Sequence, residues 1–100
     1  MAAPTTLLTG KTAIVTGGTR GIGGGISREF IARGANVAMV YVNPAKKAAA
    51  EKFATELSSL GGDNSAIAIC ADLAEADGPA TIVKKTLEKF GGNRIDIIGK

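Results

Sequence analysis

The 100-residue sequence contains no histidine and no tryptophan, and it has a single cysteine, a single tyrosine and three prolines. Without histidine, neither a Ser-His-Asp triad nor a histidine-based metal site can be built. The lone thiol, Cys70, cannot form an internal disulfide, and its place in an apolar run predicts a buried, inert side chain. We therefore expect no resident metal and a reducing, cytoplasmic compartment.

Long apolar runs and dense positive charge are missing as well. No uncharged apolar stretch approaches the ~18 residues of a membrane-spanning helix, and residues 1–11 lack the basic start and apolar centre of a signal peptide. The net charge of +3 is spread thinly, with basic doublets only at Lys46-Lys47 and Lys84-Lys85. The sequence therefore indicates a soluble, unsecreted protein that binds neither membranes nor nucleic acids.

The length permits one small domain or part of a larger one. Hydrophobic residues make up 45% of the chain, which is typical of an ordered globular protein. Glycine, with 14 residues, is about twice as frequent as usual, and six of these glycines lie between Gly17 and Gly25. Such clustering indicates a local demand on the backbone conformation.

Apolar runs typical of buried strands alternate with helical stretches, and this alternation predicts a parallel sheet with crossover helices. The expected strands are residues 12–16, 36–42, 66–71 and 94–98, and the expected helices are residues 21–33, 44–60 and 79–90. Glycines are expected to end each helix, and Asn43-Pro44 to begin the second one.

The periodicity of apolar residues predicts which face of each helix is buried. The residues expected to face the sheet are Ile22, Ile26 and Phe30 in the first helix, Ala49, Phe53, Leu57 and Leu60 in the second, and Val83, Leu87 and Phe90 in the third. Gly24 and Gly25 continue the glycine run into the first helix, where they should weaken its start by about 1–2 kcal/mol.

The segment Val15-Thr16-Gly17-Gly18-Thr19-Arg20-Gly21-Ile22-Gly23 connects the first strand to the first helix. Phosphate groups bind where bare backbone N–H donors and a helix N-terminus point at them, and glycine permits that close approach. The spacing is not that of a Walker loop, because glycines stand where lysine and Ser or Thr are needed. It also differs from the common G-x-G-x-x-G pattern, because Ile26 replaces the third glycine. We therefore predict a phosphate-binding loop rather than a simple turn.

With its Thr-Gly-x-x-x-Gly-x-Gly spacing, this segment resembles the nucleotide-binding loop of the short-chain dehydrogenase/reductase family. The resemblance covers essentially the whole chain, through Gly34-Ala35-Asn36-Val37, Ala71-Asp72-Leu73, Phe90-Gly91 and Ile95-Asp96-Ile97. It implies a three-layer Rossmann-like α/β fold with a doubly wound parallel sheet, in the strand order 3-2-1-4 and truncated after the fourth strand. Residues 1–100 would be the N-terminal dinucleotide-binding part of a single Rossmann domain. One helix alone would cover the second sheet face, which should stay largely bare.

The resemblance implies a nicotinamide cofactor, and the end of the second strand indicates which one. NAD-binding members carry Asp or Glu about 20 residues after the loop, whereas Tyr41-Val42-Asn43 stands there in this chain. A carboxylate would repel the 2′-phosphate of NADP by about 1–4 kcal/mol, so its absence favours NADPH. Arg20 resembles the basic residue with which NADP-preferring members hold that phosphate, and Asn43 could add a hydrogen bond. A solvated loop charge is the alternative for Arg20.

The residues expected to bind NADP(H) are Gly17, Thr19, Arg20, Gly21, Ile22, Gly23, Tyr41, Asn43, Asp72 and Leu73. The resemblance implies that Asp72 bonds the adenine amino group and that Leu73 lies against the ring. From the residues alone, Asp72 could instead cap a turn, and Tyr41 could be an ordinary strand residue.

Members of this family transfer hydride with a Tyr-x-x-x-Lys pair and an upstream Ser, all beyond the fourth strand. Ala45 rather than lysine follows four residues after Tyr41, so we expect no catalytic residue here and no activity of these 100 residues alone. We interpret the chain as the cofactor-binding half of an NADPH-dependent carbonyl reductase or alcohol dehydrogenase. The complete enzyme would be a homo-oligomer that acts on a small carbonyl or alcohol. The alternative is a truncated, non-catalytic NADP(H)-binding or regulatory protein.

Overall fold

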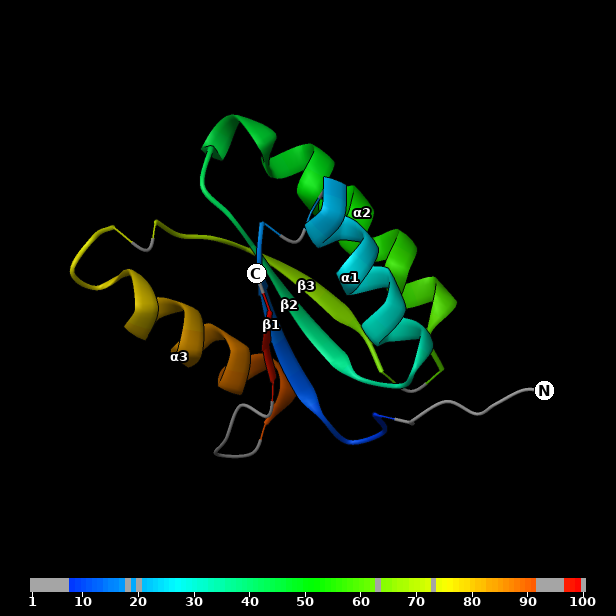
Figure 1. Cartoon of the computed structure of the whole chain (residues 1–100). Coiled ribbons are helices and arrows are strands. Elements are labelled where there is room, and N and C mark those ends of the chain that lie inside the picture. The colour runs from blue at the N-terminus through cyan, green and yellow to red at the C-terminus, as the bar shows by residue number, and fades with distance from the viewer. Residues whose placement is uncertain are drawn as a thin grey trace.

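The computed structural model describes residues 8–17, 19, 21–62, 64–72, 74–91 and 97–99. Its elements are β1 (Thr12–Thr16), α1 (Gly21–Ala32), β2 (Asn36–Tyr41), the short 3-10 helix η1 (Pro44–Lys46), α2 (Lys47–Leu60), β3 (Ala66–Cys70), α3 (Gly78–Phe90) and β4 (Ile97–Gly99). The predicted alternation of strands and helices is confirmed (Figure 1). Of the last expected strand, residues 94–98, the structure describes β4 from Ile97 onward, and residues 92–96 lie outside the described residues.

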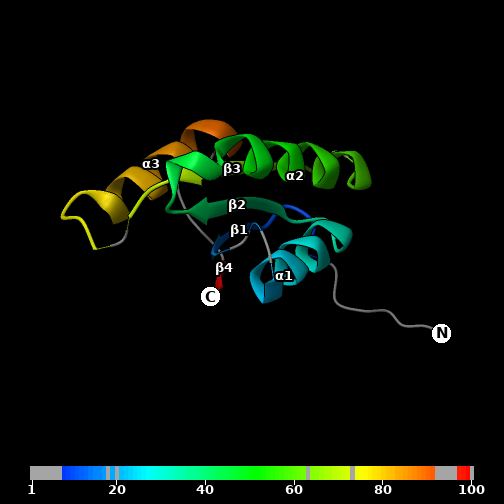
Figure 2. The same ribbon diagram turned by 90° about the horizontal axis from the view of Figure 1, so that it is seen from above.

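The strands form one parallel sheet in the order β3-β2-β1-β4 (Figure 2). In the register of this sheet, Ala13 pairs with both Val37 and Ile97, and Tyr41 pairs with Cys70. Because parallel strands all end at the same edge, the segments that follow β1, β2 and β3 gather there. The starts of α1 and α2 lie at this edge, in the upper part of Figure 1.

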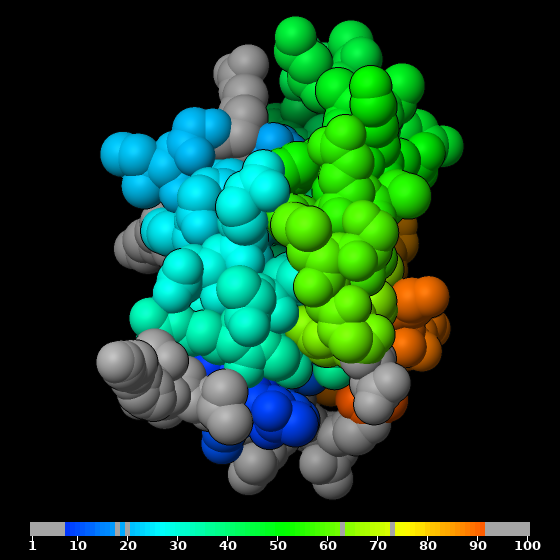
Figure 3. Space-filling view, turned by 90° about the vertical axis from the view of Figure 1, so that its right-hand side faces the viewer, coloured from blue at the N-terminus to red at the C-terminus, as the bar shows by residue number. Residues whose placement is uncertain are grey.

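Helices cover both faces of the sheet, so the expected three-layer α/β fold is confirmed. Side chains of β1 and β2 alternate between the two faces, as the pleat of a strand requires. Val15 and Met39 pack with Ile31 of α1 and Leu57 of α2. Figure 3 shows these two helices side by side over that face. The opposite cluster consists of Ile14, Ala38, Val40 and Ile69 with Ile82 of α3.

The expectation that the second sheet face stays largely bare is wrong for the strands whose side chains the structure describes. Ile14, Ala38, Val40 and Ile69 are each at most 4% exposed. Ile82 of α3 is buried in the same cluster, and the half-buried Phe90 packs against it. The face that carries α3 is therefore a second core rather than an open apolar surface.

The buried line of each helix differs from the predicted one. The residues buried along these lines are Gly24, Ser27 and Ile31 in α1, Ala50, Ala54 and Leu57 in α2, and Gly78, Ile82 and Thr86 in α3. The predicted inward residues that are instead exposed are Ile22 (84%), Leu60 (59%), Val83 (41%) and Ala49. Small residues on the contact line let the helix approach the sheet closely, and larger side chains such as Phe30 and Phe53 fill the flanks. The periodicity of large apolar residues therefore finds Leu57 on the line of closest contact, but otherwise finds residues on its flanks.

Cys70 is half-buried rather than buried, which corrects the sequence expectation. It is the last residue of β3, at the edge of the sheet order, and its Sγ lies 3.5 Å from the Val42 carbonyl oxygen. An edge strand has a neighbour on one side only, so its end is less completely covered. Glycine does end α1 and α3 as predicted: Gly34 and Gly91 have φ values of 99° and 76°. No helix formed by the described residues is long and apolar enough to cross a bilayer.

Candidate functional site

A cavity of about 690 Å³ lies at the carboxyl edge of the sheet. Its walls come from the end of β1 and the loop after it, the end of β2, the start of α2 and the segment after β3. The lining residues are Thr16, Gly17, Thr19, Gly21, Val40, Tyr41, Val42, Asn43, Lys46, Ala49, Ala50, Ala71 and Asp72. In open α/β sheets, ligands bind at this edge, beside the strand where the order of strands reverses. Here that strand is β1, which lies between β2 and β4.

The loop after β1 owes its shape to two glycines. Gly17 and Gly21 have φ values of 65° and 62°, which side chains other than glycine rarely adopt. An added Cβ would meet no atom within 4 Å at either position, so the demand is on conformation and not on space. The Gly17 N–H donates to the Val40 carbonyl at 2.9 Å and ties the loop to β2. Donors for an anion must therefore come from later in the loop and from the first turn of α1, which contains no acidic residue.

Six of the ten residues that the sequence analysis selected line the same cavity: Gly17, Thr19, Gly21, Tyr41, Asn43 and Asp72. Ile22 and Gly23 do not line it. Arg20 and Leu73 lie outside the described residues. Seven further lining residues were not expected from the sequence: Thr16, Val40, Val42 and Ala71, which belong to or adjoin the strand ends, and Lys46, Ala49 and Ala50. The position of the last three just after Asn43-Pro44, at the start of the helix that follows β2, is the signal that could have found them.

Asn43 shapes the turn between β2 and α2. Its Oδ1 accepts a hydrogen bond from the Ala45 N–H at 3.0 Å, and its carbonyl accepts one from the Lys46 N–H at 2.9 Å. The predicted cap is therefore confirmed, although it begins η1 before the α-helix. The amide oxygen accepts in the cap, and the side-chain NH₂ of Asn43 is the group of this side chain that can donate to a phosphate.

Asp72 both lines the cavity and caps a turn. Its Oδ1 accepts from the Ala74 N–H at 2.9 Å, and its carbonyl accepts from the Glu75 N–H at 3.0 Å. The turn-capping alternative is thus correct as a local description. It does not exclude contact with a ligand, because the residue is half-buried on the cavity wall. The turn holds the carboxylate in place beside the cavity.

Tyr41 is 8% exposed at the end of β2. Burial raises the pKa of its hydroxyl above the ordinary value of 10.0, and the negative charges of ionised Cys70 and Glu51 raise it further. The hydroxyl therefore remains protonated near neutral pH. This is the opposite of the lowered pKa that would activate a tyrosine as a base.

We expect the alkaline titration of Tyr41 to report this environment. Well below pH 10 the folded and unfolded chains both keep the proton, so there the residue has no effect on the pH dependence of stability. As the pH rises past that value, the unfolded chain loses its proton first and the free energy of unfolding falls. Because Tyr41 is the only tyrosine in the sequence, phenolate absorbance reports it directly, and Tyr41→Phe should remove its share of the alkaline loss. A phenolate midpoint at or below that of free tyrosine would contradict the burial argument.

Comparison with known proteins agrees with this architecture. The family model described as short chain dehydrogenase matches residues 11–99. Oxidoreductase UcpA of Escherichia coli K12 is 41% identical over 91 residues, which are 91% of this chain and 32% of UcpA. Hydroxynaphthalene reductase arp2 of Aspergillus fumigatus is 40% identical over 91 residues, which are 91% of this chain and 31% of arp2.

A solved structure is also similar to this chain. The crystal structure of a blue fluorescent protein from a metagenomic library, in complex with NADPH, matches with a TM-score of 0.80 and 36% identity. The match covers 91% of this chain and 35% of that one. The chain spans about a third of the length of the curated relatives it matches, 32% of UcpA and 31% of arp2. Since the family match extends over residues 11–99, the chain belongs to the short-chain dehydrogenase family.

Proposed function

We propose that this chain binds NADP(H) as the N-terminal dinucleotide-binding part of a short-chain oxidoreductase. The observation that carries the proposal is the cavity at the carboxyl edge of β1 and β2. Its walls combine a glycine loop at the start of α1 with a β2 end that has no carboxylate. These are the two features that a phosphorylated dinucleotide requires of a Rossmann-like sheet.

The proposed binding mode follows the positions of the walls. The pyrophosphate would lie over residues 17–23, where the helix N-terminus favours negative charge. The adenosine would extend past the ends of β2 and β3, with Asn43 and Asp72 beside it. Tyr41, a buried residue of β2, would form the floor of the cavity between Asn43 and Asp72.

NADPH rather than NADH is the proposed cofactor. No carboxylate at the end of β2 opposes a 2′-phosphate, and Asn43 can donate through its amide NH₂. The metagenomic blue fluorescent protein was crystallised with NADPH, which supports the same choice for this chain. Arg20 remains the residue that the sequence proposes for the phosphate.

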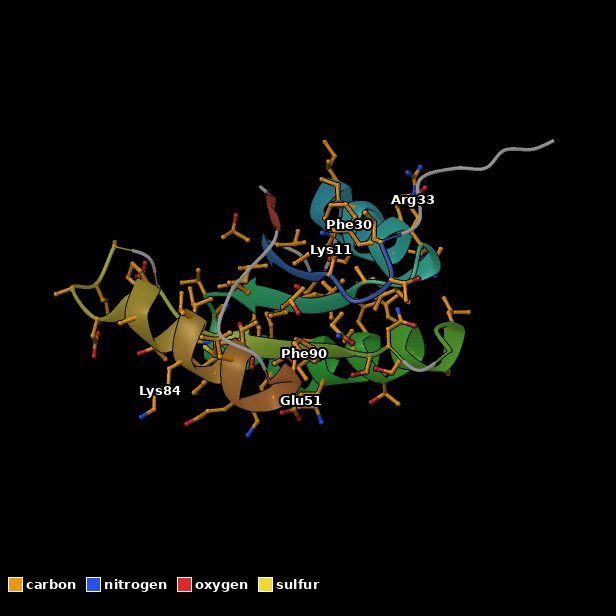
Figure 4. The ribbon with its side chains drawn as sticks, turned by 90° about the horizontal axis from the view of Figure 1, so that it is seen from below. Lys11, Phe30, Arg33, Glu51, Lys84 and Phe90 are labelled. Carbon is orange, nitrogen blue, oxygen red and sulfur yellow. The ribbon has the colours of Figure 1, made fainter. Side chains whose placement is uncertain are left out.

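We expect a titration of the chain with each reduced cofactor to separate them. NADPH should bind with a Kd at least about tenfold lower than that of NADH, because the end of β2 presents no carboxylate to the 2′-phosphate and Arg20 is proposed to pair with it. Arg20→Ala should reduce this preference. Lys84→Ala is the control for lost charge, since Lys84 is exposed on α3 and points away from the sheet (Figure 4). An equal or lower Kd for NADH would reject the NADP assignment.

We infer that the complete enzyme reduces a carbonyl group, or oxidises the corresponding alcohol, of a small molecule. The relative arp2 carries the name of a reductase, which supports this direction. Tyr41 is a poor candidate for proton transfer, because it is buried with a raised pKa and Ala45 follows it where the family pattern needs lysine. The proposal therefore gives cofactor binding to these residues and proton transfer to residues outside them. Homo-oligomeric assembly and a cytoplasmic location stay predictions.

A further inference from the structure

Lys46 is the only cationic residue on the cavity wall among the residues that the structure describes. It is the last residue of η1 and the N-cap position of α2. Asp72 is the only acidic residue on the same described wall, and it comes from the segment after β3. The described part of the wall thus carries one cation, which lies on the turn that follows β2, and one carboxylate.

The backbone of Lys46 is held in place from two sides. Its N–H donates to the Asn43 carbonyl at 2.9 Å, and the Pro44 carbonyl accepts from the N–H of the next residue, Lys47. Asn43 is itself fixed by the hydrogen bond from the Ala45 N–H. Lys46, three residues after Asn43, is thereby held on the wall of the cavity.

Within the described part of the chain, no ion pair that involves the side-chain ammonium group of Lys46 is recorded. The ion pair recorded there joins Glu29 of α1 and Arg33, which follows the end of that helix. The Lys46 side chain makes no capping hydrogen bond at the start of α2. A flexible cation on the wall of a cavity, free of acidic partners, is suited to pair with an anionic ligand group.

We propose that Lys46 selects the phosphorylated cofactor by pairing with the 2′-phosphate of the adenine ribose. The inference depends on the proposed function, because this phosphate is the group that distinguishes NADP from NAD. It adds a determinant in the turn after β2 to the one proposed at Arg20 in the glycine loop. Lys47 carries the same charge one residue later but does not line the cavity, and so it provides a matched control.

The test measures binding to the full chain by calorimetry for the wild type, Lys46→Gln, Lys46→Arg and Lys47→Gln. The ligands are NADPH, NADH, adenosine 2′,5′-bisphosphate and adenosine 5′-monophosphate. We expect Lys46→Gln to raise the Kd of the two 2′-phosphorylated ligands about tenfold and to change the other two by less than about twofold. Lys46→Arg should retain most of the affinity, and Lys47→Gln should resemble the wild type. Salt should weaken NADPH binding more in the wild type than in Lys46→Gln.

Several outcomes would overturn the inference. Equal losses for NADPH and NADH would mean that Lys46 contacts a shared part of the cofactor or only supports the turn. Equal increases in the Kd of NADPH for Lys46→Gln and Lys47→Gln would mean that any positive charge near this turn favours binding, without a specific role for Lys46. If the wild type prefers NADPH and Lys46→Gln keeps that preference, this inference fails and the proposed function stands. If the wild type binds neither dinucleotide, both fail.

Discussion

The double variant Gly17→Ala/Gly21→Ala is expected to lose about 2–4 kcal/mol of unfolding free energy, since each left-handed residue costs about 1–2 kcal/mol once it has a Cβ. Both residues have positive φ values and neither is crowded, so the loss would be purely conformational. Gly25→Ala is the matched control. Gly25 lies within α1, does not have a positive φ and has nothing within 4 Å of an added Cβ, so this change should stabilise by about 1 kcal/mol. Urea unfolding of the three proteins measures both effects.

The same double variant should also bind NADPH more weakly, by at least about tenfold, if the loop cradles the pyrophosphate. A loop that relaxes to negative φ at these positions would change the direction of its peptide N–H groups. Gly25→Ala should leave the Kd near that of the wild type. Unchanged stability in the double variant would contradict the assigned backbone conformation. If the double variant is less stable but binds NADPH with the Kd of the wild type, the loop does not bind the pyrophosphate.

Leu57→Ala is expected to cost about 2–5 kcal/mol, as is usual when a fully buried leucine is truncated. Leu57 is 0% exposed and packs in the core between α2 and the sheet. Leu60→Ala should change the stability by no more than about 0.5 kcal/mol, because Leu60 is 59% exposed one turn later on the same helix. The apolar periodicity alone treats both leucines as inward. Thermal or urea unfolding measures the two losses of unfolding free energy. Equal losses for Leu57→Ala and Leu60→Ala would mean that both leucines face inward, as the periodicity predicts.

Much of the architecture could be predicted from the sequence because its determinants are local. Short β-branched and apolar runs such as residues 12–16 form strands, and glycines such as Gly34 and Gly91 end helices at positive φ. The Asn43-Pro44 pair begins a helical segment because side-chain capping and a fixed proline φ act within a few residues. The glycine loop after β1 could be found for the same reason.

The helix faces could be predicted only in part: Leu57 is buried as expected, whereas Ile22 and Leu60 are exposed. The remainder depends on which residues the sheet touches. Asn64 illustrates the same point for polar contacts. Its Nδ2 donates to the Ile31 carbonyl at 3.0 Å and to the Ala35 carbonyl at 2.6 Å, which joins the end of α1 to the start of β3. No pattern near Asn64 in the sequence indicates partners so far along the chain.

The sequence by itself determined the order of strands and helices, the position of the glycine loop and the absence of a carboxylate after β2. Each depends on residues that are neighbours along the chain. Only the tertiary structure decided that Lys46 and Asp72 share a cavity with Gly17, and that Ile22 and Leu60 face outward. Parallel pairing brings separate strand ends to one edge, and close packing selects the buried side of each helix. These are contacts between distant residues, which form only when the chain is folded.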